Sequence, residues 1–344
     1  MKALLLGAAL LVSGSLFAQF PNVTLPEASQ AASLSQQIGL TDVDVTYHSP
    51  LSRGRKIWGD LVPYNEVWRA GANENTTVSF STDVSVEGQK LAAGTYGLHM
   101  IPTEAEWTII FSKSNAAWGS YFYKESEDAL RVKVKPQEAA AQDWLSYTFE
   151  ELQMGSAVLA LRWEKLRVPV KIAVDVPQTV VADLRRQLTG LSGFNPDAYY
   201  TAAAYCFRNK VNEQEAMTWL DRSIRDKPTF QNQRLKADLL EKEGKKTEAE
   251  ALRKKALDAA DEAGLNAYGY QLLGQGKTTE AIDVFRTNVK RYPTSWNVYD
   301  SLAESLENTG NKKEALTYYK TARQKAPKDQ HARLDKTIAK LAEK

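Results

Sequence analysis

The sequence predicts a multidomain protein: an all-β antiparallel sandwich, residues 38–176, followed by an all-α repeat solenoid, residues 197–329. Two periodicities support this fold class. Polar and apolar residues alternate along residues 42–48, which is typical of a strand with one buried face. In the second half, Pro293 and Pro327 lie 34 residues apart, and each closes a pair of amphipathic segments with small residues at the same offsets.

The N-terminus has the features of a cleavable secretory signal peptide, residues 1–18. Lys2 precedes an apolar run, residues 3–12, and the small residue Ala18 ends the segment. This run is too short for a membrane span. No cysteine lies near the junction to carry a lipid, so we expect a periplasmic or secreted protein without a lipid anchor. Residues 19–37 are rich in Pro, Ala, Ser and Gln and are expected to form a tether.

The composition excludes several classes of partner. The chain has 44 basic and 42 acidic residues and a formal net charge of +2, which leaves no electrostatic footprint for nucleic acid or an anionic membrane. Cys206 is the only cysteine, so no intrachain disulfide can form. We expect Cys206 to be a buried packing residue, with a reactive thiol as the alternative.

Eight further runs show strand patterning after residues 42–48, and turn signals such as Glu87-Gly88 separate them. Short strands with little helix between them favour an antiparallel sandwich or barrel. Residues 115–128 interrupt the alternation and are expected to form an aromatic loop or a short helix. The eight runs are residues 76–81, 84–86, 95–101, 107–112, 130–134, 145–149, 158–163 and 168–174.

Residues 177–195 are expected to form a connector helix, because Val181, Leu184 and Leu188 recur at helical spacing. This helix is expected to pack on the first repeat. Residues 330–344 show the same spacing and are expected to cap the last repeat.

Small residues mark four repeats between residues 197 and 329. Antiparallel helices approach closely at such positions, so a larger side chain would separate them. The second helices carry Ala216, Ala249, Ala281 and Ala315, which are 33, 32 and 34 residues apart. The first helices carry Ala204, Ala237, Gly269 and Ala303 at the matching position. The space beside them is filled by Leu220, Phe285 and Tyr319, whereas Arg253 and Asn288 depart from the pattern. This half resembles the tetratricopeptide repeat, whose solenoid implies protein binding.

Three motifs in the first half also suggest a family. They are residues 54–64 (GRKIWGDLVPY), 67–76 (VWRAGANENT) and 93–98 (AGTYGL). The segment that contains them, roughly residues 30–175, resembles the bacterial domain of unknown function 2911, although Ala92 stands where the family has proline. The resemblance implies an exported or envelope-associated protein and no assigned activity.

One segment of this domain concentrates cations, aromatic rings and an amide. Guanidinium groups beside such residues could bind a carboxylate, phosphate or sugar. The alternative is that the aromatic rings cover one end of the sandwich and the arginines pair with Asp60, Glu66 or Glu74. The candidate ligand-binding residues are Arg53, Arg55, Trp58, Trp68, Arg69, Asn73 and Glu74.

No catalytic motif is present, so we assign no catalytic residue, metal ligand or cofactor. One alternative stays open: His48 and His99 could meet across strands, with Asp60 or Glu74, as a hydrolase or metal site.

The main functional hypothesis is an exported adaptor that binds a protein or peptide through the groove of the repeats. First-helix residues line such a groove, and tyrosines beside mixed charges suit an extended peptide or a helix. A merely solvated polar groove is the alternative. The candidate partner-binding residues are Tyr205, Arg234, Asp238, Tyr270, Asp300 and Glu304, with Thr201 and Asn266 beside them.

Overall fold

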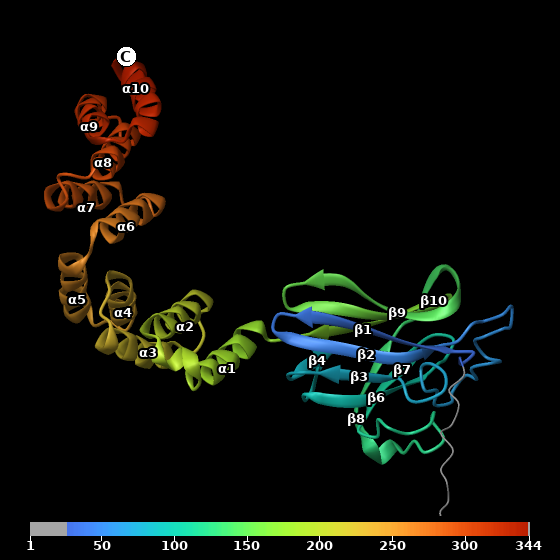
Figure 1. Ribbon diagram of the computed structural model, residues 1–344. Coiled ribbons are helices and arrows are strands. Elements are labelled where there is room, and N and C mark those ends of the chain that lie inside the picture. Colours follow the sequence, from blue (N-terminus) through green and yellow to red (C-terminus); the bar gives the residue numbers. More distant parts are fainter. Residues whose placement is uncertain (1–25, 343–344) are drawn as a thin grey trace, which may run out of the picture. The chain divides into compact units, whose positions relative to one another are not determined.

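The computed structural model describes residues 26–342, and Figure 1 shows the order of the elements. The chain forms two compact units, Met1–Asp175 and Val176–Lys344. The expected signal peptide and the first part of the expected tether lie outside the described residues. Within residues 26–342 no helix is long and apolar enough to cross a membrane.

Two antiparallel sheets build the described part of the first unit. One has the strand order β1-β2-β3-β6-β7-β8 and the other β5-β4-β10-β9. Side chains from both sheets form one continuous apolar core, which confirms the antiparallel all-β fold of this half. The strands are β1 (Gln30–Ile38), β2 (Thr41–Ser49), β3 (Thr77–Phe80), β4 (Val84–Val86), β5 (Gln89–Leu91), β6 (Gly94–Ile101), β7 (Trp107–Ser112), β8 (Asp128–Val134), β9 (Gln137–Gln153) and β10 (Ser156–Ala173).

The strand β1 corrects the expected tether over residues 30–37. It pairs antiparallel with β2 from Gln30 opposite Ser49 to Ile38 opposite Thr41. An edge strand pairs on one side only and needs little apolar surface. Its Ser/Gln-rich sequence therefore shows only a weak alternation of polar and apolar residues. Ala32 and Leu34 still face the core, and Ile38 is buried.

The other sheet differs from the expected strands in two places. The runs 158–163 and 168–174 belong to one strand, β10, whose register against β9 shifts on both sides of Glu164. Such a bulge interrupts the alternation in sequence without ending the strand. The three-residue strand β5 has too few residues to show a period. Residues 115–128 form a loop with one turn of 3₁₀ helix, Glu125–Glu127.

Paired helices build the second unit, as Figure 1 shows, and the expected all-α solenoid is confirmed. The connector is α1 (Val176–Leu188), followed by a 3₁₀ turn at Leu191–Phe194. The four pairs are α2 (Pro196–Asn209) with α3 (Glu213–Asp226), α4 (Phe230–Lys242) with α5 (Lys246–Ala259), α6 (Glu262–Gly274) with α7 (Thr278–Arg291), and α8 (Trp296–Asn308) with α9 (Lys312–Lys325); α10 (Lys328–Ala342) follows.

Polar side chains start several of these helices. Asn195 accepts a hydrogen bond from the backbone N–H of Asp197, and Pro196 occupies the first helical position. At α4, Thr229 and Asn232 bond to each other's backbone N–H in a capping box. These residues satisfy backbone donors that have no partner inside the helix.

The small positions lie where the helices of a pair touch. Ala216, Ala249, Ala281 and Ala315 are all fully buried. At Gly269 the approach is closest, because a Cβ there would lie 2.5 Å from two ring carbons of Phe285. The residues at these positions therefore set the spacing within each pair.

Both ends of the repeat array are covered by a helix. Val181 of α1 is fully buried against Ala202, Ala203 and Cys206 of α2, so the connector packs on the first repeat. Burial raises the pKa of the Cys206 thiol to about 11, which keeps it protonated and unreactive. At the other end, Leu334 and Leu341 of α10 are buried in the core of the last repeats, and Ile338 packs against it.

Candidate functional site

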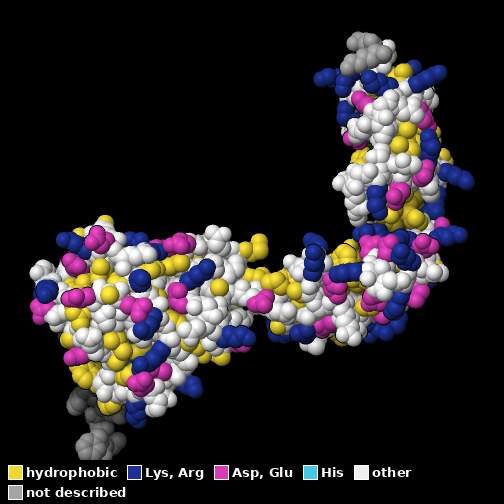
Figure 2. Space-filling view, turned by 180° about the vertical axis from the view of Figure 1, so that it is seen from behind, with side chains coloured by type: hydrophobic (Ala, Val, Ile, Leu, Met, Phe, Trp, Pro, Cys, Tyr) yellow, Lys and Arg dark blue, Asp and Glu magenta, His cyan; other side chains and the backbone are white. Residues whose placement is uncertain are grey.

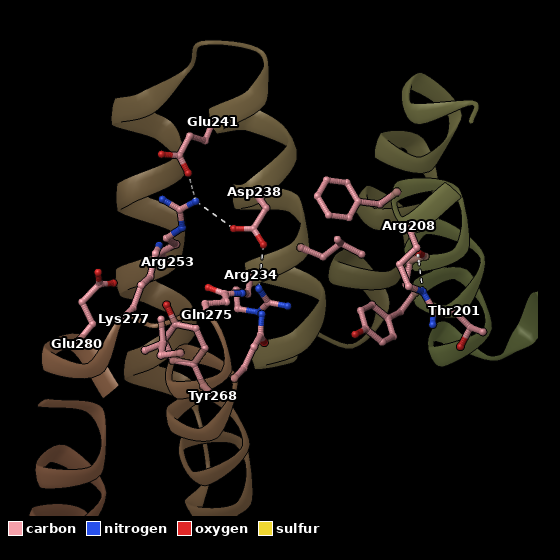
Figure 3. A pocket seen from close by; sticks show the side chains of 16 residues that line it. Thr201, Arg208, Arg234, Asp238, Glu241, Arg253, Tyr268, Gln275, Lys277 and Glu280 are labelled. Carbon is pink, nitrogen blue, oxygen red and sulfur yellow. Dashed lines mark hydrogen bonds and ion pairs between the residues drawn. The ribbon is translucent and has the colours of Figure 1, made fainter. Parts of the chain in front are cut away.

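A groove of about 810 Å³ lies along the first three repeats (Figure 3). Both polar and apolar side chains line it, and most of them come from the first helices. The lining is Tyr200, Thr201, Ala204, Phe207 and Arg208 of α2, Arg234, Leu235, Asp238 and Glu241 of α4, Arg253 of α5, Tyr268, Gln271 and Leu272 of α6, then Gln275, Lys277 and Glu280.

Arg253 organises the centre of this groove. The equivalent residue in the later repeats is Phe285 or Tyr319, whose ring fills the space between the two helices. Arg253 instead turns its guanidinium toward α4, where it bonds to Glu241 and, at 3.0 Å, to Asp238. Its departure from the repeat pattern was the signal in the sequence that could have marked the site.

A second arginine shares the same carboxylate. Arg234 donates to Asp238 at 2.8 Å, and its guanidinium lies 5.9 Å from the ring centre of Tyr268. Asp238 therefore holds both Arg234 and Arg253 in place, and the tyrosine ring adds a cation–π contact. The result is an ordered, basic-aromatic surface.

Two further cations of the groove have no carboxylate partner in the part of the chain that the structure describes. Arg208 bonds only to the carbonyl of Ala204, at 3.4 Å, and Lys277 makes no ion pair. Figure 2 shows basic and acidic side chains intermixed over the visible surface. Sequence reasoning missed both residues because they lie at the ends of helices.

The structure brings some of the expected partner-binding residues together in the groove. Others make contacts outside it. Arg234, Asp238 and Thr201 line the groove. Tyr270 donates to Glu304 at 2.6 Å, which joins α6 to α8 outside it.

Asp300 pairs at 2.8 Å with Arg333 of α10. The carboxylate of Asp300 is therefore already bonded to the capping helix. Tyr205 and Asn266 belong to first helices but do not line the groove.

The candidate ligand-binding residues of the first unit divide among several places. Arg55 donates from its side chain to the carbonyls of Ser52 and Leu51, so it stabilises its own turn. Arg53 adopts the left-handed conformation, and its backbone N–H bonds to Asp143. Neither side chain lines the hollow that contains Arg69.

Trp58 and Trp68 belong to an aromatic cluster. Trp58 is buried and makes edge contacts with Trp107 and Trp163, at 4.7 and 5.8 Å between ring centres. Trp68 stacks on Trp163 at 6.1 Å and donates to the carbonyl of Gly71. The packing of both sheets, which local sequence does not reveal, assigns Trp58 to the core.

Arg69 forms no ion pair within residues 26–342, and the same is true of the exposed Arg53 side chain. The expected alternative, an ion pair with Asp60, Glu66 or Glu74, is not formed within residues 26–342. The guanidinium of Arg69 borders a separate hollow of about 310 Å³.

Asn73 and Glu74 lie with His48 rather than with the arginines. Glu27 approaches Nε2 of His48 and Glu74 approaches Nδ1, both at 3.4 Å, and Asn73 donates to Glu27 at 2.5 Å. The three acidic and imidazole groups are close enough to hold one metal ion. However, the carboxylates face opposite ring nitrogens, and one ion can be bound by only one of these. The arrangement suits a histidine bridged by two carboxylates.

His99 is engaged in a different network. Its Nδ1 lies 2.9 Å from Oγ of Ser120, and its ring lies 5.2 Å from that of Tyr123. Tyr123 in turn donates to Asp128 at 2.7 Å. Since β3 separates β2 from β6 in the sheet, His48 and His99 come from non-adjacent strands. The two histidines therefore do not form the joint site that the sequence suggested.

Burial controls the protonation of this network. It lowers the pKa of His99 to about 4, against a smaller opposite effect of Asp128, and it raises the pKa of Tyr123 to about 12. The imidazole is therefore neutral near pH 7.

Comparison with known proteins agrees with the resemblance of the first half. Residues 29–172 match the family model described as "Protein of unknown function (DUF2911)", so this expected resemblance is confirmed. No curated protein matches the chain.

Among solved structures, the repeats are similar to MamA AMB-1, with 22% identity over 44% of this chain and 90% of that one and a TM-score of 0.26. YrrB, described as a TPR protein with an unusual peptide-binding site, is 18% identical over 47% of this chain and 84% of its own, with a TM-score of 0.28. PilF of Pseudomonas aeruginosa is 19% identical over 42% of this chain and 67% of its own, with a TM-score of 0.28.

Proposed function

We propose that this protein is an exported adaptor that binds a protein or peptide segment in the groove of its first three repeats. The observation that carries this proposal is the groove itself. It is a hollow of about 810 Å³ with arginines fixed by Asp238, a tyrosine ring at one of them, and two cations that have no described carboxylate partner.

The charges of the groove favour an acidic segment as the occupant. Asp238 and Glu241 are already bonded to Arg234 and Arg253. Of the lining groups without an ion pair in the described part of the chain, two are basic, Arg208 and Lys277, and one is acidic, Glu280, so the unpaired charge of the groove is basic on balance. Phe207, Leu235 and the tyrosines offer apolar surface between the cations. An extended chain with acidic residues around one apolar side chain matches this arrangement.

Selection of displayed peptides on the full-length protein tests the proposal. We expect the selected peptides to be rich in Asp and Glu. Their affinity should fall at least about tenfold for the double variant Arg208→Gln/Lys277→Gln, a loss of about 1.4 kcal/mol. The matched control is Lys313→Gln, which removes a positive charge from α9, outside the groove. Peptides that bind the double variant and wild type equally well would contradict this assignment.

Export is the second part of the proposal. Lys2, the apolar run over residues 3–12 and Ala18 occur in the order that signal peptidase substrates require. Mass spectrometry of the protein recovered from the producing cells should show a mature N-terminus at Gln19. Recovery of a chain that still begins at Met1 in the envelope fraction would argue against cleavage.

A further inference from the structure

The hollow beside Arg69 is built from two loops of the first unit. Glu66, Trp68 and Arg69 come from the segment before β3, and Ser120 and Tyr121 come from the loop between β7 and β8. Its volume of about 310 Å³ is suited to a ligand of monosaccharide size. None of these residues belongs to the groove of the repeats, so the inference does not depend on the proposed function.

Arg69 faces this hollow with donors that the protein does not use. Its Nε is buried and has no hydrogen-bond partner, and its guanidinium forms no ion pair within the described part of the chain. A buried donor without an acceptor is unfavourable. Most other arginines of this unit, such as Arg131 and Arg167, are bonded to carboxylates. A carboxylate ligand in the hollow would supply acceptors to the Nη groups of Arg69, which have no hydrogen-bond partner within the described residues, whereas the buried Nε stays out of its reach unless the side chain moves.

The loop between β7 and β8 is shaped to admit the guanidinium. Gly119 has a φ of +60°, and a Cβ there would lie 2.8 Å from Nη1 of Arg69. The backbone N–H of Asn75 donates to the carbonyl of Ala117 at 3.2 Å, which fixes the position of the loop. The left-handed conformation favours glycine here, and a Cβ would displace the end of the Arg69 side chain.

Ser120 adds a second polar group. Its Oγ lies 2.9 Å from Nδ1 of His99. When Nδ1 carries the hydrogen, the ring donates to Oγ, and the hydroxyl proton of Ser120 is available to the hollow. Glu66, which is exposed, can accept hydrogen bonds from ligand hydroxyls. It also disfavours a ligand with more than one negative charge.

Exposed aromatic rings lie on the same loop. The exposed fractions are 51% for Trp118, 79% for Tyr121 and 68% for Phe122. Rings that remain exposed next to a hollow are typical of ligand-binding surfaces, because their flat faces can stack on an apolar face of a ligand.

We propose that this hollow binds a monosaccharide acid, with the carboxylate on Arg69, hydroxyl groups on Ser120 and Glu66, and the sugar ring against Tyr121. The guanidinium provides the affinity for the carboxylate. Glu66 and the aromatic ring distinguish a sugar acid from inorganic phosphate.

Titration calorimetry of the full-length protein with glucuronate, glucose and inorganic phosphate tests this. We expect glucuronate to bind more tightly than glucose or phosphate. Arg69→Gln should weaken glucuronate binding roughly 10- to 100-fold, and Gly119→Ala should also weaken it by displacing the guanidinium. Lys90→Gln, which removes a positive charge from β5, should bind as wild type does. The melting temperature of Arg69→Gln should stay close to that of wild type, because the guanidinium forms no ion pair within the described residues that could be lost.

Four results would overturn the proposal: no glucuronate binding by wild type, equal or tighter binding of phosphate, equal binding of glucose, or unchanged glucuronate binding by Arg69→Gln. Gly119→Ala with wild-type affinity would likewise reject the placement of the carboxylate on Arg69.

Discussion

Lowering the pH from about 7 to 4 is expected to remove about 3 kcal/mol of stability from the first unit through His99 alone. Burial lowers the pKa of His99 from 6.5 to about 4. Between these values the unfolded chain binds a proton that the folded protein does not bind. Unfolding is therefore increasingly favoured as the pH falls through this window, and His99 contributes no further loss below it.

Urea unfolding at a series of pH values, followed by tryptophan fluorescence, measures this effect. Six of the eight tryptophans lie between Trp58 and Trp163, in the first unit. His99→Gln keeps a polar side chain beside Ser120 but cannot titrate, so its stability should fall less steeply between pH 6.5 and 4. His331→Gln, in α10 of the other unit, should retain the wild-type slope. An unchanged slope in His99→Gln would show that other groups cause the acid sensitivity.

Replacing Gly269 by alanine is expected to destabilise the repeats by up to about 2 kcal/mol. Alanine at this position is better for a helix by about 1 kcal/mol, and the other first helices carry alanine there. The new methyl group, however, would lie 2.5 Å from the buried ring of Phe285. Overpacking of this kind costs about 1–3 kcal/mol, and the ring has no exposed side toward which it can move.

Chemical unfolding followed by circular dichroism at the helical band measures this difference. Phe285→Leu removes the ring, so the same Gly269→Ala change made in that background should cost less or become stabilising, with a coupling of about 1 kcal/mol or more. The matched control is Ala303→Gly in the fourth repeat, where alanine is native and fully buried, so the opposite change should destabilise by about 1 kcal/mol or more. If the stability changes of Gly269→Ala and Phe285→Leu were fully additive, the two positions would not interact.

The repeats could be predicted in detail because their contacts are local in sequence. Phe285 and Gly269 meet within one helix pair. The spacing of small and large residues in the sequence is therefore enough to predict the pairing of the helices. The charged groove was predicted in part: Arg234 and Asp238 lie on one helix four residues apart. Lys277 and Arg208 come from different repeats, and only the stacking of those repeats brings them to one hollow.

In the first unit, by contrast, contacts between residues distant in sequence decide most of the side-chain positions. Alternation predicted most of its strands, but the residues between His48 and Thr76 have no period that reveals their partners. Long-range packing places Trp58 in the core and Glu74 beside His48, whereas Arg55 bonds locally to the carbonyls of its own turn. The residues that complete the Arg69 hollow, Ser120 and Tyr121, are some 50 positions away in sequence.

The sequence by itself determined the two fold classes, the helix pairs and most strands, because backbone period and the contact of near neighbours decide these features. The tertiary structure decided which polar groups have partners. Packing of the sheets enclosed His99, whereas it left the Nε of Arg69 without an acceptor. Whether a charged side chain finds a partner depends on groups that are distant in sequence and near in space, and only the folded chain fixes their distances.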